Sequence, residues 1–191
     1  MPRVSFYKKI FLPVSFLVFT LLSANVSAAT DEQAQLWYQM GYDYSQKRLN
    51  DEAFKWTIRA AEAGHIVAQN NIGLSYLHGL GVKKDKNAAF KWFEKSAKQG
   101  LSYAQSELAM LYYRQGNTAQ AQKWWQIAAD SNDEYAQFNL ASLFLEQNKL
   151  EKALYWFEKA RENRHPDASI ALKKMSEARL PTYKTKEKYE K

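Results

Sequence analysis

The sequence predicts an all-α fold, a right-handed α-solenoid of about four helix-turn-helix repeats that ends in a C-terminal capping helix. The first observation is a phrase, AFKWFEKSAKQG at residues 89–100, that occurs in four related copies with Trp at its fourth position. The second is an upstream pattern of apolar, small, two variable residues and an aromatic, such as IGLSY at 72–76. The third is their common period: Trp56, Trp92, Trp124 and Trp156 are separated by 36, 32 and 32 residues, which is typical of stacked helical repeats.

Each repeat is predicted to contain two helices. Apolar residues in the first half recur at three- and four-residue intervals, which is the stripe of an amphipathic helix, as in Ala104, Leu108, Leu111 and Tyr112. Gly64 and Gly100 suit the C-terminal ends of helices, where a left-handed residue is needed. Asp51, Asp85 and Thr118 are expected to be N-caps.

The repeats divide the chain into three parts. We expect a signal peptide over residues 1–28, a repeat domain over 29–180 and a basic, disordered tail over 181–191. Within the domain, the repeats are expected at about 34–65, 66–101, 102–133 and 134–165, and the capping helix at 166–180.

The recurring Trp and small residues are predicted to be packing positions. A large ring from the second helix fills the space between the two helices of a repeat, and a small residue on the first helix lets them approach. One helix pair cannot bury its apolar face alone, so the repeats must stack. The predicted structural core comprises Trp56, Trp92, Trp124 and Trp156 with Gly41, Gly73, Ala109 and Ala141.

Residues 1–28 have the three parts of a secretory signal peptide. Arg3, Lys8 and Lys9 form a positive n-region, residues 10–22 are apolar, and small residues then place the cleavage site between Ala28 and Ala29. As a helix the apolar run would span about 20 Å, less than the ~30 Å hydrocarbon core of a bilayer. We therefore expect export, with no transmembrane anchor after cleavage.

The positive charge of the chain lies mainly at its ends. The formal net charge of +7 includes Arg3, Lys8 and Lys9 of the leader and a Lys-rich tail after Pro181. A nucleic-acid-binding protein instead concentrates positive charge on one folded face. We expect no nucleic-acid partner.

No catalytic or metal-binding pattern is found. The chain has no Cys, and His65, His78 and His165 do not show the spacing of metal ligands. The first and last of these are expected in turns between repeats. The Gly-containing stretch GLGV at 79–82 lacks the preceding strand and the following Lys-Ser/Thr of a phosphate-binding loop. The sequence therefore predicts a protein that is not an enzyme and has no cofactor.

The second repeat, AQNNIGLSYLHGLGVKKDKNAAFKWFEKSAKQG at 68–100, resembles the Sel-one-like repeat family, which is related to tetratricopeptide repeats. The distinctive parts are the loop at 79–82 and Asp85. The other repeats lack this loop and are four residues shorter, which is closer to tetratricopeptide geometry, and Trp37 occupies that family's early aromatic position. The resemblance covers about residues 34–176 and implies a fold that holds other proteins together.

In tetratricopeptide-like superhelices the first helices line the concave face, which allows groove residues to be predicted. Several are large and apolar, and an exposed apolar groove usually marks an interaction site. Tyr adds contact area with a polar end, which suits peptide recognition. Two alternatives stay open: these residues are ordinary core, or the convex face is used instead. The candidate groove residues are Tyr38, Tyr42, Asn70, Leu74, Leu77, Met110, Tyr113 and Phe138, with Ser106, Ser142 and Leu145 at equivalent positions.

Export and the repeat fold together predict a protein–protein interaction scaffold or adaptor in the bacterial cell envelope, located in the periplasm and holding a partner segment in its groove. One alternative is a secreted effector or virulence-type factor that binds host proteins. Another is a peptidoglycan- or glycan-binding module that stacks sugars on groove aromatics. The sequence does not identify the partner.

Overall fold

The computed structural model describes residues 31–178, and the regular secondary structure in that range is entirely helical. The all-α repeat fold predicted from the sequence is confirmed for this range. The predicted signal peptide with its cleavage site at Ala28 and Ala29, and the predicted tail over 181–191, lie outside it. The first helix covers residues 31–46; it is followed by α2 (Asn50–Glu62), α3 (Ile66–His78), α4 (Lys86–Lys98), α5 (Ser102–Arg114), α6 (Thr118–Asp130), α7 (Glu134–Glu146), α8 (Leu150–Glu162) and α9 (Ala168–Glu177).

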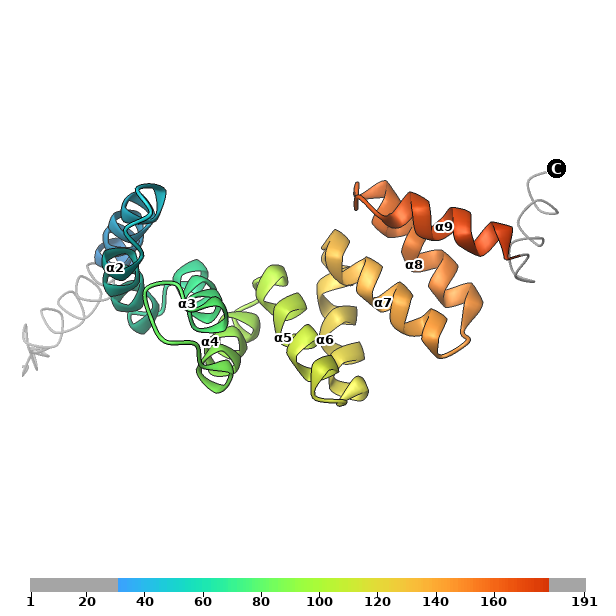
Figure 1. Cartoon of the computed structure of the whole chain (residues 1–191), viewed down its shortest axis with the longest axis horizontal. Helices are drawn as coiled ribbons and strands as arrows, with labels where there is room; N and C mark the ends of the chain where they lie inside the picture. The colour runs from blue at the N-terminus through green and yellow to red at the C-terminus, as the bar shows by residue number, and fades with distance from the viewer. Residues whose placement is uncertain (1–30, 179–191) are drawn as a thin grey trace, which may run out of the picture.

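The helices are stacked in chain order along one row (Figure 1). From α2 onward, the main contacts of each helix are with the helices before and after it. We call the pair formed by 31–46 and α2 unit 1, α3 and α4 unit 2, α5 and α6 unit 3, and α7 and α8 unit 4. The short helix α9 has the sequence phase of a first helix. Because each unit mainly contacts its neighbours, the stability of the row is close to a sum of unit and interface contributions.

The helix starts follow the predicted N-caps only in part. Asp85 caps α4, because its carboxylate accepts hydrogen bonds from two backbone N–H groups of the first turn. The N-caps of α2 and α6 are Leu49 and Asn117, so the predicted caps Asp51 and Thr118 lie inside the first turn. Asn ranks above Thr as an N-cap, and an acidic residue in the first turn interacts favourably with the helix dipole.

The loop between α3 and α4 packs back onto unit 1. Gly79 ends α3 in the left-handed conformation, with φ +77°. Gly81 is also left-handed, with φ +68°, and a Cβ there would collide with the backbone of Asn50 at the start of α2. Gly81 is therefore needed for the close approach of this loop to the neighbouring unit, and Gly79 for the left-handed end of α3.

The space between the paired helices is filled by the residue after each predicted Trp. Phe93, Trp125 and Phe157 are buried, whereas the predicted core residues Trp56, Trp92, Trp124 and Trp156 are only partly buried. A Cβ on Gly73 would lie 2.8 Å from the ring of Phe93, so this ring faces the small residue on the first helix. The small residues Gly41, Gly73, Ala109 and Ala141 are all buried.

The tryptophans instead pack at the boundary with the preceding unit. Trp92 packs on a cluster that includes Ala60 of α2, and Trp124 packs on one that includes Phe93 of α4. The exposed side of such a ring interacts with a cation from the next helical turn, since Lys95 Nζ lies 4.0 Å from the centre of the Trp92 ring. The prediction that the tryptophans fill the interior of each unit is wrong by one position, because the enclosed side chain is that of the next residue in the sequence.

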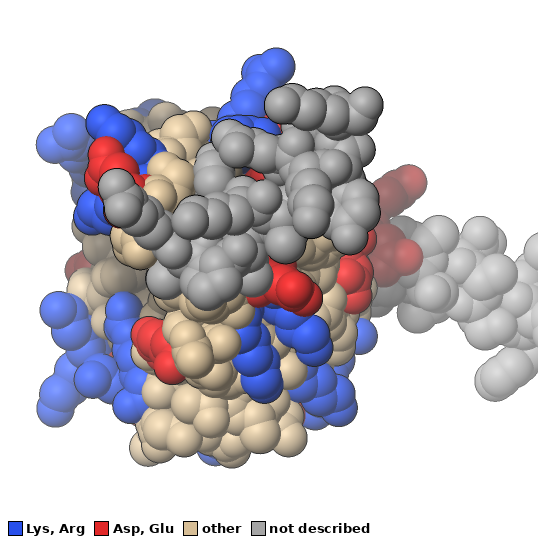
Figure 2. All heavy atoms as spheres, turned by 90° about the vertical axis from the view of Figure 1, so that its right-hand side faces the viewer, with Lys and Arg blue, Asp and Glu red and all other residues tan. Residues whose placement is uncertain are grey.

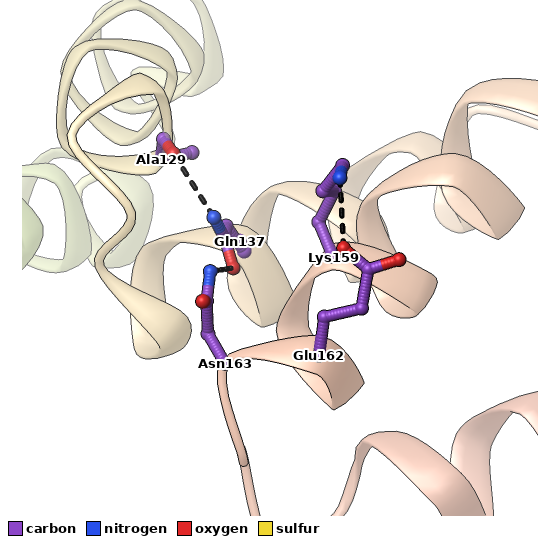
Figure 3. A network of polar contacts seen from close by, with 5 residues as sticks. All are labelled: Ala129, Gln137, Lys159, Glu162 and Asn163. Carbon is purple, nitrogen blue, oxygen red and sulfur yellow. Dashed lines mark hydrogen bonds and ion pairs between the residues drawn. The ribbon is translucent and has the colours of Figure 1, made fainter.

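A repeated glutamine links each unit to the one before it. The side-chain Nε2 groups of Gln69, Gln105 and Gln137 donate to the backbone carbonyls of Ala61, Ala97 and Ala129, at 3.2, 3.2 and 3.1 Å. Figure 3 shows the last of these bonds together with a second contact, from Asn163 Nδ2 to Gln137 Oε1 at 2.9 Å. The nearby ion pair between Lys159 and Glu162 is 2.7 Å long. Gln137 thereby connects the C-terminal ends of α6 and α8.

The middle glutamine lacks the second contact. Gln69 Oε1 accepts from Gln99 Nε2 at 2.6 Å, and Gln99 has the same repeat position as Asn163. In unit 3 this position is Ser131, whose hydroxyl donates to its own helix at Ile127 O. Within the part of the chain that the structure describes, the buried Gln105 Oε1 has no hydrogen-bond partner.

Candidate functional site

The first helices of units 2, 3 and 4 enclose a hollow of about 630 Å³, which we call the central groove. It brings together residues of α3, α5 and α7 that are distant in sequence, together with Lys86 at the start of α4. The predicted groove residues Leu77, Ser106 and Met110 line it. The other lining residues are His78, Lys86, Tyr103, Glu107, Leu111, Arg114, Tyr135 and Asn139.

The central groove combines aromatic surface with charge of both signs. Burial raises the pKa of Glu107, while its hydrogen bond with Tyr103 and the positive charges of His78 and Arg114 act in the opposite direction. Burial, followed by the negative charge of Glu107, raises the pKa of the Tyr103 hydroxyl. Tyr103 and Tyr135 are exposed. Aromatic faces beside a partly desolvated carboxylate are suited to binding a polypeptide segment, in which apolar and charged groups alternate.

A second, more apolar hollow of about 700 Å³ lies at the C-terminal end. It includes the predicted residues Phe138, Ser142 and Leu145 of α7, which meet Ile170 and Met175 of α9. Asp167 and Lys174 are the charged residues among those that line it. At the opposite end of the row, a hollow of about 190 Å³ includes the predicted residues Tyr42 and Leu74.

Two predicted groove aromatics are partly covered by histidines from the turns between units. Tyr38 stacks on His65, with ring centroids 4.4 Å apart. Phe138 stacks on His165, with centroids 4.1 Å apart and an interplanar angle of 9°. Both phenyl rings are partly buried. These two positions therefore contribute to packing as well as to the first-helix face.

The remaining predicted residues are also held by contacts inside the protein. Asn70 is buried rather than open to a groove, and within residues 31–178 its Oδ1 has no hydrogen-bond partner. Its prediction as a groove contact residue is corrected, because its side chain is buried and does not line the central groove. The Tyr113 hydroxyl donates to both carboxylate oxygens of Glu146, at 2.8 and 2.9 Å, across units 3 and 4.

The groove prediction missed seven lining residues of the central groove that carry polar groups, including His78 and Lys86 at the edge of unit 2. Tyr103 and Tyr135 share one repeat position, five residues before the apolar landmark of each unit, and Glu107 and Asn139 share the position directly before it. Each pair is 32 residues apart, as the repeat requires. Comparing equivalent positions across units would have found these four residues. Arg114 could have been found because it directly follows the predicted groove residue Tyr113.

His65 and His165, in the turns between units, have structural roles in the described chain. His65 Nδ1 accepts from the N–H of Ala68 at 3.1 Å, and His165 Nδ1 accepts from the N–H of Asp167 at 3.2 Å. Both rings must be neutral at Nδ1 to accept, and burial lowers the pKa of both imidazoles. No group of three or more potential metal ligands occurs among residues 31–178.

Family models match most of the described repeats. The Sel1 repeat model matches residues 32–65 and 66–101, and the tetratricopeptide repeat model matches residues 106–169. The chain is a repeat protein of the Sel1 and tetratricopeptide type. Sel1 and tetratricopeptide repeats are typically non-catalytic modules, and they indicate a protein–protein interaction scaffold. No curated protein gives a significant match.

Solved structures with the same repeat agree with this assignment. A Sel1 repeat protein from Oxalobacter formigenes is 30% identical, with a TM-score of 0.69 over 74% of this chain and 63% of that protein. The c5321 protein, described as a protective antigen of uropathogenic Escherichia coli with an SLR fold, is 29% identical, with a TM-score of 0.72 over 83% of this chain and 37% of that one. This Sel1-type chain thus spans less than two thirds of either relative. MamA, at 15% identity and a TM-score of 0.54, shares the fold alone, with 76% of this chain and 86% of MamA covered.

Proposed function

We propose that this Sel1-type repeat protein is a non-enzymatic scaffold of the bacterial cell envelope that binds a segment of a partner protein in its central groove. The observation that carries the proposal is the central groove itself, where three first helices present exposed Tyr103 and Tyr135 around the partly buried Glu107. Tyrosines supply contact area at low entropic cost, and such residues dominate binding energy at protein interfaces.

The proposed location is the periplasm. It rests on the signal-peptide pattern of residues 1–28 and on the expected cleavage between Ala28 and Ala29. Among residues 31–178, no helix has the length and apolar content of a membrane span. Fractionation followed by N-terminal sequencing tests this: Ala29 as the first residue of periplasmic protein is expected, and an uncleaved cytoplasmic chain would contradict it.

Groove binding is tested by photo-crosslinking in living cells. A photoreactive phenylalanine analogue is placed at Tyr103 or Tyr135 in the groove, and at Tyr155 of α8 as the matched control. All three tyrosines are exposed, so the substitutions should not unfold the protein, and Tyr155 does not line the central groove. We expect the same protein partner to be crosslinked from both groove positions and not from Tyr155.

A pull-down with substituted protein then shows whether the groove tyrosines are needed for binding or only lie near the partner. The double variant Tyr103→Ala/Tyr135→Ala should lose the partner in a pull-down of tagged periplasmic protein, whereas Tyr155→Ala should retain it. Equal capture by both variants would contradict the groove assignment. Capture from the culture medium only would favour a secreted effector, and sedimentation with purified peptidoglycan that depends on Tyr103 would favour a glycan-binding module.

A further inference from the structure

The first helix exposes positions that are buried in every later unit. Leu36 and Met40 occupy two repeat positions that hold a small and a large apolar residue in the later units. The equivalent pairs are Ala68 and Ile72, Ala104 and Leu108, and Ala136 and Leu140. These six equivalents are all 0% exposed, whereas Leu36 is 59% exposed and Met40 is 38% exposed. Helix 31–46 therefore carries a surface that the rest of the fold uses for stacking between units.

In the later units this surface is covered by the second helix of the preceding unit. Ala68 and Ile72 of α3, for example, form one buried cluster with Ala60 and Ala61 of α2. Helix 31–46 is the first helix of the described row and has no such neighbour in front of it within residues 31–178 (Figure 1). Helix 31–46 also lacks the linking glutamine of the later units, because Trp37 occupies the repeat position of Gln69, Gln105 and Gln137. We call the surface around Leu36 and Met40 the N-terminal face.

We propose that the N-terminal face binds the same face of a second copy, which gives a two-fold symmetric dimer with the two first helices antiparallel. The charges on either side of the apolar pair support this arrangement. Asp31 and Glu32 begin the helix, and Lys47 and Arg48 directly follow it; all four are exposed. Since Leu36 and Met40 lie near the middle of the segment 31–48, a two-fold axis there places the acidic start of one copy beside the basic end of the other.

Pairing of the N-terminal face with the C-terminal end of another copy is disfavoured by the chemistry of α9. Its outer surface carries Lys173 and Glu177, which are paired at 3.8 Å and largely exposed. Figure 2 shows this end of the molecule, where Lys and Arg side chains lie at several separate places around the described surface with Asp and Glu between them. Lys173 also has the repeat position of the small residues Ala109 and Ala141. A head-to-tail contact would bury these charges, and it would extend into filaments instead of closing.

The predicted dimer is weak because each copy contributes one helix. Stable interfaces bury about 800 Å² per partner, and a single exposed helix face provides less. We therefore expect association at micromolar concentrations or above, with monomers at high dilution. A dimer would hold two central grooves at a fixed separation, which raises the avidity for a partner that presents two binding segments.

Sedimentation equilibrium of the purified full chain and of the exported, cleaved chain tests the proposal over a range of about 1–200 µM, which brackets a weak interface. We expect the mass to rise toward that of a dimer, and Met40→Glu to raise the dissociation constant at least tenfold. Tyr155→Glu is the control, because it places the same charge at an exposed large side chain of α8, and it should leave the constant unchanged. A mass that stays monomeric in both chains would overturn the proposal.

Charge reversal distinguishes the antiparallel dimer from other self-association. Lys47→Glu/Arg48→Glu should weaken the dimer, because acidic groups then face acidic groups. All the residues are exposed, so the cost to folding is limited to the lost interaction of the two cations with the helix C-terminus. Adding Asp31→Lys/Glu32→Lys to that variant should restore the dissociation constant to within about threefold of the original, and the rescue should fade at high salt. Association that is insensitive to both reversals, or that Tyr155→Glu removes, would overturn the proposed geometry.

Discussion

Replacement of Ser131 by Asn tests whether the linking glutamines stabilise the joints between helices. In units 2 and 4, the glutamine carbonyl accepts from Gln99 or Asn163 at 2.6 or 2.9 Å. In unit 3, the side chain of Ser131 is too short to reach, and Gln105 Oε1 is buried without a partner among the described residues. Ser131→Asn places a donor at the position that Asn163 occupies in unit 4.

The expected gain follows from the cost of an unsatisfied buried carbonyl. A net hydrogen bond in a protein contributes about 0.5–1.5 kcal/mol, and leaving a buried acceptor unpaired costs ~1–3 kcal/mol. Ordering the Asn side chain and losing the exposed bond from Ser131 to Ile127 O offset part of this gain. We expect Ser131→Asn to raise the free energy of unfolding by about 1 kcal/mol, which corresponds to a rise in Tm of roughly 2–4 °C for a domain of this size.

Urea unfolding, followed by far-UV circular dichroism and by Trp fluorescence, measures the change. The two probes should coincide before a free energy is extracted, because repeat arrays can lose cooperativity. Ser131→Ala is the control and should change stability by less than about 0.5 kcal/mol, since it removes only an exposed hydroxyl. The same Asn substitution in a Gln105→Met background should give no gain. A gain that persists without Gln105, or no gain with it, would refute the assignment of this hydrogen bond.

Three further changes test the packing and the titrating groups. Gly73→Ala should destabilise the protein by about 1–3 kcal/mol in urea titrations, because the added Cβ lies 2.8 Å from the Phe93 ring in a closely packed joint; an unchanged midpoint would refute this. Gly81→Ala should cost at least as much, since φ is +68° and the obstacle is the backbone of Asn50; tolerance of Ala would show that the loop moves freely. Burial lowers the folded-state pKa of His165 below 6.5, so the stability of its neutral form is present above that pH and is lost as the pH falls through the lowered value. His165→Asn keeps a side-chain acceptor before the Asp167 N–H but does not titrate, so it should lose less stability than the wild type between about pH 7.5 and 5; equal losses would exclude His165 as the source.

The repeat could be predicted from the sequence because its apolar, small and aromatic residues recur at a fixed period. The sequence did not show which aromatic side chain packs against each small residue. Trp92 and Phe93 are adjacent aromatics. The apolar stripe of a helix is wide enough to include two neighbouring positions, so the 3.6-residue period does not show which of the two is enclosed. Unit 1 added to the error, because Trp56 is followed there by Thr57, and the Trp was the constant residue. Only the position of the rings against Gly73 shows which residue is enclosed.

The central groove was predicted in part for a similar reason. The repeat phase correctly placed Leu77 and Met110 on its wall. It could not show that Asn70 is buried, because burial depends on side chains of other helices, which the position within one repeat does not specify. It also missed Glu107, which a search for apolar groove residues passes over.

The position of the central groove follows from how the units differ at two equivalent positions. In units 1 and 4, an aromatic ring on the first helix, Tyr38 or Phe138, stacks on a histidine of the following turn. In unit 3 the ring is replaced by Ser106, and the histidine by Asp133. The small Ser106 lines the hollow, and burial raises the pKa of the nearby Asp133 carboxyl, whose negative charge also raises the pKa of Tyr103 and Glu107. The constant residues of the repeat therefore build the row, whereas a departure from the repeat accompanies the central groove.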